Sequence, residues 1–137
     1  MNDHDLPTPA PTVYPETKDF WDGTSRSELR LQRCDDCDSV VWYPRGICPE
    51  CSSFSLTSFT ASGRGSIYTW TTISRGIAEY RDVGPYVLAY VELEEGPRVM
   101  TNIVENKPDD LVIGGAVEAV FQSTPDGAAL LRFRPVH

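Results

Sequence analysis

The chain carries Cys34-Asp35-Asp36-Cys37 and, ten residues further on, Cys48-Pro49-Glu50-Cys51. These two Cys-x-x-Cys pairs hold all four of its cysteines. The tight turn of each pair brings two thiolates onto one metal ion, and two such pairs complete a tetrahedron. A site with four cysteine ligands has no position left for water, and such closed sites are structural. We therefore predict a structural Zn²⁺ bound by Cys34, Cys37, Cys48 and Cys51.

Short strands are indicated on both sides of the first cysteine pair. Leu29-Arg30-Leu31-Gln32-Arg33 alternates apolar and polar side chains, which is the period of a strand. Val40-Val41-Trp42-Tyr43 is β-branched and aromatic and precedes a Pro44-Arg45-Gly46 turn. We predict a rubredoxin-like zinc ribbon over residues 29–60. A thiol oxidoreductase is the alternative for a Cys-x-x-Cys motif, but such enzymes use one pair at the start of a helix.

The remainder of the chain has almost no helical periodicity. Apolar and polar side chains alternate in runs that are separated by turn signals such as Glu94-Glu95-Gly96-Pro97 and Pro125-Asp126-Gly127. We predict a mainly β protein with a five-stranded OB-fold barrel over residues 61–137. An open sandwich is the alternative. The predicted strands cover residues 66–74, 86–93, 98–105, 117–122 and 128–134.

The first 28 residues differ in composition from the rest. Four prolines among small and polar residues predict a flexible, proline-rich tail over residues 1–16. Residues 17–28 are predicted to form a short helical arm with Thr17 as its N-cap and Gly23 as its stop. Phe20 and Trp21 on this arm are large and apolar, so they must dock either on this domain or on a partner.

Charge and hydropathy limit the classes of partner. The net charge is −8, and bases outnumber acids in none of the tail and arm, the ribbon or the barrel. This balance argues against a nucleic-acid partner, because non-specific binding of nucleic acid depends on basic surface. No stretch is apolar and long enough for a membrane span, and the acidic start does not resemble a signal peptide. We expect a soluble cytoplasmic protein without a membrane partner.

The inventory of catalytic side chains is thin. His4 and His137 are the only histidines, and both lie at the termini, where order is poor. With the cysteines committed to metal, no Cys–His or Ser–His–Asp site can be assembled in a rigid core. We therefore predict no catalytic residues and do not expect a self-sufficient enzyme.

Five polar side chains are candidates for binding a ligand or partner. One group belongs to a long loop at the expected mouth of the barrel, and the other lies near the junction of ribbon and barrel. Arginines at such places can contact phosphates, although solvated arginines are the simpler interpretation of each one. The five residues are Arg75, Tyr80 and Arg81 in the loop, and Arg45 and Arg64 at the junction.

Several motifs follow one another along the chain. They are Phe20-Trp21, Leu29-Arg30-Leu31-Gln32-Arg33-Cys34, Tyr43-Pro44-Arg45, Cys48-Pro49-x-Cys51, Ser62-Gly63-Arg64-Gly65, Pro85-Tyr86, Val91-Glu92-Leu93-Glu94-Glu95-Gly96 and Leu111-x-Ile113-Gly114. Taken in this order, they resemble the DUF35 family over roughly residues 18–134. Two positions after the cysteine pairs, Asp38 and Ser52, depart from the family's common glycine, and Tyr43 stands where a proline is common.

The resemblance implies a helical arm, a rubredoxin-like zinc ribbon and an OB-fold. It also implies a non-catalytic subunit that binds acyl-CoA and stabilises a thiolase-superfamily enzyme acting on CoA thioesters. The first candidate partner is a side-chain-cleaving aldolase of steroid catabolism or a thiolase, and a MaoC-like hydratase is a further one. The alternatives are a single-stranded nucleic-acid-binding module, with Tyr68, Trp70 and Tyr86 as stacking residues, and a stand-alone acyl-CoA hydrolase or transferase.

Overall fold

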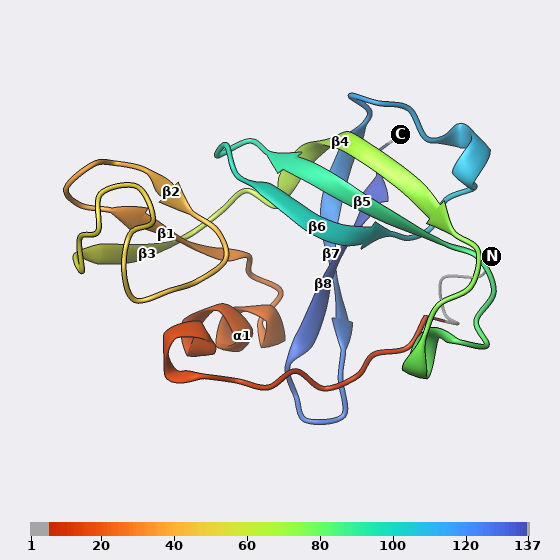
Figure 1. Cartoon of the computed structure of the whole chain (residues 1–137), viewed down its shortest axis with the longest axis horizontal. Helices are drawn as coiled ribbons and strands as arrows, with labels where there is room; N and C mark the ends of the chain where they lie inside the picture. Colours follow the sequence, from red (N-terminus) through yellow and green to blue (C-terminus); the bar gives the residue numbers. More distant parts are fainter. Residues whose placement is uncertain (1–5, 137) are drawn as a thin grey trace.

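A computed structural model describes residues 6–136 of the chain. The two histidines and the first five residues of the predicted tail therefore lie outside the described residues. Figure 1 shows three parts: a small sheet, a barrel, and a short helix below and between them. In chain order the elements are η2 (Pro15–Thr17), α1 (Lys18–Ser25), β1 (Arg30–Cys34), β2 (Val40–Val41), β3 (Leu56–Thr60), β4 (Arg64–Ile73), η3 (Ala78–Tyr80), β5 (Tyr86–Leu93), β6 (Arg98–Ile103), η4 (Pro108–Asp110), β7 (Ala116–Ser123) and β8 (Ala129–Pro135).

The small sheet has the order β2-β1-β3, and both pairings are antiparallel. Strand β2 ends at Val41, two residues before the end of the stretch that the sequence predicted as extended. The reason is that Trp42 and Tyr43 leave the sheet to pack on the arm. Their rings lie edge to face with the ring of Phe20, at centroid distances of 5.2 Å and 5.7 Å.

Strands β4 to β8 form a closed barrel in the order β4-β5-β6-β8-β7. The predicted five-stranded OB-fold is confirmed, and closure excludes the open sandwich. Strand β5 illustrates why the alternating pattern was informative. Its side chains at Val87, Ala89, Val91 and Leu93 are buried, and those between them are half-buried or exposed.

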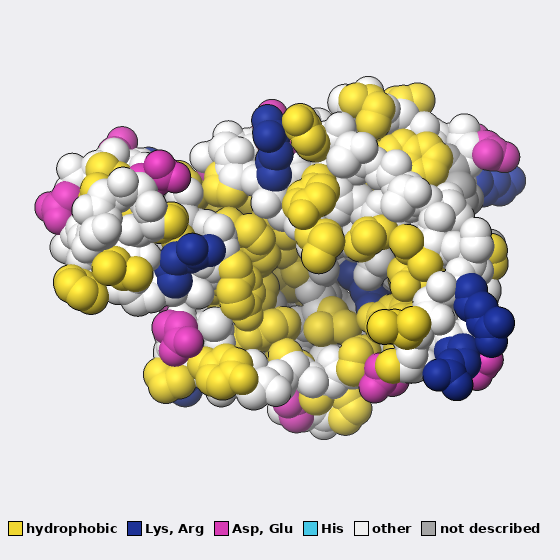
Figure 2. All heavy atoms as spheres, in the orientation of Figure 1, with side chains coloured by type: hydrophobic (Ala, Val, Ile, Leu, Met, Phe, Trp, Pro, Cys, Tyr) yellow, Lys and Arg dark blue, Asp and Glu magenta, His cyan; other side chains and the backbone are white. Residues whose placement is uncertain are grey.

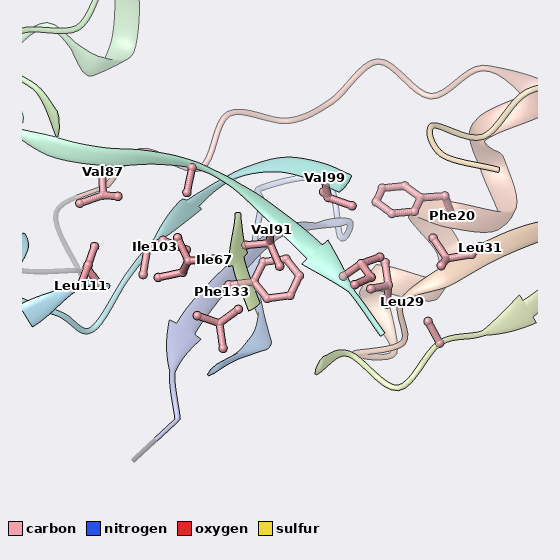
Figure 3. Close-up of a cluster of buried hydrophobic side chains, with 14 residues drawn as sticks. Phe20, Leu29, Leu31, Ile67, Val87, Val91, Val99, Ile103, Leu111 and Phe133 are labelled. Carbon is pink, nitrogen blue, oxygen red and sulfur yellow. The ribbon is translucent and has the colours of Figure 1, made fainter. Parts of the chain in front are cut away.

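One hydrophobic core joins the arm, the ribbon and the barrel. Phe20 comes from α1, Leu31 from β1, Val99 from β6 and Phe133 from β8, and none of these side chains is more than 3% exposed. Figure 3 shows Phe20 and Leu31 beside Val99, at the end of the barrel core that contains Phe133. The arm therefore docks on this chain itself. This burial supplies most of its stability, because an isolated eight-residue helix is marginal in water.

Two further contacts attach the N-terminal part to the barrel. The amide of Ala129 donates a buried hydrogen bond of 3.0 Å to Oγ1 of Thr24. Helix α1 runs to Ser25, so the prediction that Gly23 ends it is wrong. Gly23 is instead needed for close packing, because a Cβ there would collide with the side chain of Arg30.

The segment before the helix also contacts the barrel. Leu6 is buried at 6% exposure, and the carbonyl of Pro7 accepts a 2.7 Å hydrogen bond from Arg132. Composition, on which the prediction of a flexible tail rested, gave no sign of these contacts. Among the described residues, no helix is both long and apolar enough to cross a membrane.

Candidate functional site

The four cysteines converge in the small sheet, as the spacing predicted. Cys34 Sγ lies 3.5 Å from Cys51 Sγ, and Cys37 Sγ lies 3.6 Å from Cys48 Sγ. All four sulfur atoms are within 4.8 Å of one another. A tetrahedral zinc ion with Zn–S bonds of about 2.3 Å requires sulfur atoms about 3.8 Å apart. The thiols therefore fit a structural Zn²⁺, which has no coordination position left for a substrate.

The two cysteine turns have nearly the same hydrogen bonds. The amide of Asp38 donates to the carbonyl of Cys34, and the amide of Ser52 donates to the carbonyl of Cys48, each at 2.9 Å. The side chain and backbone of Ser39 lower the pKa of Cys37 to about 6, whereas the neighbouring thiols, chiefly that of Cys34, raise the pKa of Cys51 to about 12. The thiols of the cluster therefore ionise one after another, and a bound metal needs them all as thiolates.

Asp38 and Ser52 have φ values of 65° and 66°. This is the left-handed region in which a side chain is strained and glycine is not. These are the two positions where the family resemblance implies glycine, and both have the left-handed turn conformation although neither residue is glycine.

Ser52→Gly is expected to stabilise the zinc-loaded protein by about 0.5–1 kcal/mol. Glycine removes the cost of the left-handed conformation, about 1–2 kcal/mol. It also raises the entropy of the unfolded chain, which lowers stability by a somewhat smaller amount. Denaturant unfolding measures the change. Ser74→Gly is the matched control, because Ser74 is an exposed loop residue that does not have a positive φ. Glycine relieves no strain there, so this variant should be less stable than the wild type. Equal shifts in both variants would contradict the strain at Ser52.

A cavity of about 260 Å³ lies between the arm, the ribbon and the barrel. We call it the arm cavity. Figure 2 shows a hollow in this region whose walls are mostly hydrophobic side chains. Its twelve lining residues are Phe20, Trp21, Trp42, Tyr43, Tyr80, Val99, Met100, Thr101, Asn102, Leu130, Leu131 and Arg132.

Ring contacts and a hydrogen bond hold the aromatic end of the arm cavity together. Phe20 stacks edge to face on Trp21 at 4.8 Å, and Trp21 Nε1 donates a 3.1 Å hydrogen bond to the hydroxyl of Tyr43. Trp42 and Tyr43 are also edge to face, at 5.2 Å. The zinc turns hold the loop that carries Trp42 and Tyr43, so the metal site positions one wall of the cavity.

The opposite end of the cavity contains Arg132, which is only 2% exposed. Its Nη2 donates hydrogen bonds to the carbonyl of Pro7 at 2.7 Å and to the hydroxyl of Tyr80 at 3.0 Å. Its Nη1 donates to Oε1 of Gln122. Burial lowers the pKa of Arg132, and the Tyr80 hydroxyl opposes that shift. An arginine nevertheless stays charged at neutral pH.

Of the predicted binding residues, Phe20, Trp21 and Tyr80 line the arm cavity together. The four arginines do not join them. Arg64 is exposed and pairs with Glu94 at 3.2 Å. Arg45 is exposed, and its Nε donates to the carbonyl of Tyr43 at 3.0 Å. Arg75 and Arg81 are exposed on the loop between β4 and β5.

An apolar surface on the outward side of β4, β5 and β6 adjoins the arm cavity and shares Met100 with it. We call it the outer face, and it comprises Tyr68, Leu88, Tyr90 and Met100. Tyr68 is 47% exposed, Tyr90 44% and Met100 59%. Tyr90 and Met100 are direct cross-strand partners, and Arg98 lies 3.8 Å over the ring of Tyr68. Figure 2 shows hydrophobic side chains gathered over these strands.

Comparison with known proteins identifies the family to which this architecture belongs. A family model described as the ChsH2 rubredoxin-like zinc ribbon domain matches residues 21–57, and the ChsH2 C-terminal OB-fold domain matches residues 60–122. A DUF35 domain-containing scaffold protein of Methanothermobacter thermautotrophicus is 42% identical over 98 residues, which are 71% of this chain and 74% of the relative. The chain belongs to the DUF35 family.

Two other proteins resemble this DUF35 chain. A solved chain titled "Ltp2-ChsH2(DUF35) aldolase" superposes with a TM-score of 0.80 and 30% identity, covering 92% of this chain and 98% of that one. The 3-oxo-4,17-pregnadiene-20-carboxyl-CoA hydratase alpha subunit of Mycobacterium tuberculosis is 33% identical over 116 residues. This chain matches 37% of the length of that subunit.

Sequence reasoning missed Arg132. It lies in the stretch Leu130-Leu131-Arg132-Phe133-Arg134, where alternation predicts an outward-facing, solvated arginine. Arg132 does face outward from the barrel, but Pro7, Gln122 and Tyr80 cover it. No local sequence pattern indicates that residues distant in the sequence bury this arginine.

Proposed function

We propose that this DUF35 chain is a non-catalytic accessory subunit of a thiolase-superfamily enzyme acting on CoA thioesters in the cytoplasm. The observation that carries the proposal is the similarity to the Ltp2-ChsH2(DUF35) aldolase over nearly the whole of both chains. The proposed reaction of the complex is side-chain cleavage of a steroid acyl-CoA by an aldolase, or a thiolase reaction. The name of the related hydratase subunit, which contains a steroid carboxyl-CoA, supports the substrate class and a MaoC-like hydratase as a further partner.

The chemistry of the site is consistent with an accessory function. The thiols fit a closed zinc site, and the arm cavity holds aromatic, aliphatic and amide side chains together with a buried arginine. None of these is a nucleophile with an adjacent base. The reacting groups would therefore come from the partner, and this chain would stabilise the partner and help to bind the acyl-CoA.

We propose that the outer face docks the partner. Large apolar side chains that are half exposed and adjacent across strands mark interaction surfaces more often than scattered ones do. Tyrosine and methionine are enriched in the cores of interfaces. The salt bridge of 3.0 Å between Arg98 and Glu92 would form part of the polar rim around Tyr68 and Tyr90.

Tyr90→Glu is expected to weaken partner binding about tenfold or more, because it places an unpaired charge at the centre of the proposed interface. The measurement is co-purification, followed by titration of the purified chain onto a thiolase-like aldolase subunit. The variant should fold normally, because Tyr90 is exposed and makes no hydrogen bond through its side chain within the described residues.

Val112→Glu is the matched control, because Val112 is 62% exposed and lies outside the outer face. If Val112→Glu weakened binding as much as Tyr90→Glu, the loss would come from the added negative charge itself and not from its place on the outer face. Unchanged binding by Tyr90→Glu would exclude the outer face. Failure of the wild-type chain to bind any thiolase-superfamily subunit would contradict the proposed function itself.

A further inference from the structure

The arm cavity has an apolar end and a cationic end. Phe20, Trp21 and Trp42 form the first, and Arg132 with the hydroxyl of Tyr80 forms the second. We propose that the arm cavity is a binding site for a small amphipathic carboxylic acid, whose ring or branched chain packs on the aromatic end and whose carboxylate pairs with Arg132. This proposal stands on the cavity alone and does not depend on the proposed function.

The guanidinium of Arg132 is a buried positive charge without a charged partner in the described part of the chain. Among residues 6–136, no carboxylate lies within 4.0 Å of this guanidinium. The other basic side chains of this range without an ion pair are all exposed, namely Arg45, Arg75, Arg81 and Lys107. The three groups that accept hydrogen bonds from Arg132 are all neutral. A buried charge is costly unless it is paired. An anionic ligand would supply the missing partner.

The walls of the cavity carry no negative charge. None of the twelve lining residues is acidic, although the chain as a whole has a net charge of −8. The negatively charged surface elsewhere repels organic anions, whereas the wall of the cavity contains no negative charge that would repel them. Trp21, Trp42 and Leu130 exclude a bare inorganic anion as the natural occupant, since it would leave their apolar surface in contact with water.

The size of the cavity defines the ligand further. Pockets for drug-sized ligands occupy about 300–1,000 Å³, and the arm cavity has about 260 Å³. It would therefore enclose one ring or a short branched chain with its acid group, and any larger skeleton would extend from the opening into solvent. The ring would lie against Phe20 and Trp42, whose edge-to-face contact keeps that wall in place.

The experiment titrates the zinc-loaded full chain with cyclohexaneacetate and with its neutral amide, and follows tryptophan fluorescence. Trp21 and Trp42 both line the cavity and report on occupancy. The acid is expected to bind at least about tenfold more tightly than the amide, which is the value of one hydrogen bond to a charged group. Acetate, which has no ring, is expected to give no saturable change at the same concentrations.

Arg132→Met tests the role of the charge. Methionine has a similar length, but it leaves the three hydrogen-bond acceptors of Arg132 without their donor, so some stability is lost. In the folded variant, the acid should bind no better than the amide. Arg134→Met is the matched control on the same strand, because Arg134 is exposed and paired with Glu118, and it should keep the preference. If Arg132→Met does not fold, Arg132→Lys should keep a reduced preference.

Equal binding of the acid and the amide by the wild-type chain would overturn the proposal. Absence of saturable binding of the acid at millimolar concentrations would also overturn it, as would a preference that survives in Arg132→Met. None of these results concerns the partner enzyme, so a failure here is distinguishable from a failure of the proposed function.

Discussion

The Cys37→Ser protein is expected to lose its zinc and, with it, the folded ribbon. Replacing a thiolate by a neutral hydroxyl should lower zinc affinity by more than about a hundredfold, because even the partners of metal ligands change affinity 10- to 100-fold. The ribbon depends on the metal, because its separate core consists only of Cys34, Val41 and Cys48, with Leu56 packed against them. Zinc contributes about 10–16 kcal/mol to small domains of this kind at neutral pH.

Metal content and hydrogen exchange measure this outcome. The amides of β2 and of the two cysteine turns should lose protection in Cys37→Ser, whereas those of β5 at the centre of the barrel should keep it. Ile47→Ser is the control in the same loop, since Ile47 is 40% exposed and should leave the zinc in place. A Cys37→Ser protein that still binds one zinc tightly, or a zinc-free ribbon that stays protected, would show that the metal is dispensable.

Phe20→Ala is expected to destabilise the protein by about 3–5 kcal/mol, the usual cost of removing a buried phenylalanine. This is a large share of the 5–15 kcal/mol that holds a typical domain together. The effect should be large here because the ring is 3% exposed and contacts Trp21, Trp42 and Tyr43. The substitution removes the side chain through which arm, ribbon and barrel share one core.

Phe54→Ala is the matched control for this prediction. Phe54 lies in the ribbon and is 82% exposed, so its removal should change the free energy of unfolding by less than about 0.5 kcal/mol. Denaturant unfolding of both zinc-loaded variants gives the two values. If the two proteins unfolded at the same denaturant concentration, the arm would not be part of the core.

The zinc ribbon and the barrel were predictable because their signals are local. The spacing of four cysteines is enough to indicate a metal site, and the alternation along residues 86–93 is enough to indicate a strand. The left-handed conformation at Asp38 and Ser52 was less predictable, because neither residue is the glycine that the family resemblance implies there.

The arm cavity was not predictable because it is built from distant residues. Thr24 bonds to Ala129, 105 positions away, and Arg132 bonds to Pro7, 125 positions away. No pattern within a window of sequence contains either contact. For the same reason, the proline-rich composition before residue 17 indicated a free tail and gave no sign that Leu6 is buried.

We propose that this chain supplies structure and ligand contacts to an enzyme whose reacting groups belong to a partner. The most direct measurement is acyl-CoA cleavage by a purified thiolase-like aldolase subunit, with the zinc-loaded chain added in increasing amounts. We expect no turnover by this chain alone, and a partner rate that rises at least about tenfold and saturates at a fixed ratio of the two proteins. Turnover of acyl-CoA by this chain in the absence of a partner, or a partner rate that does not respond to it, would contradict the account.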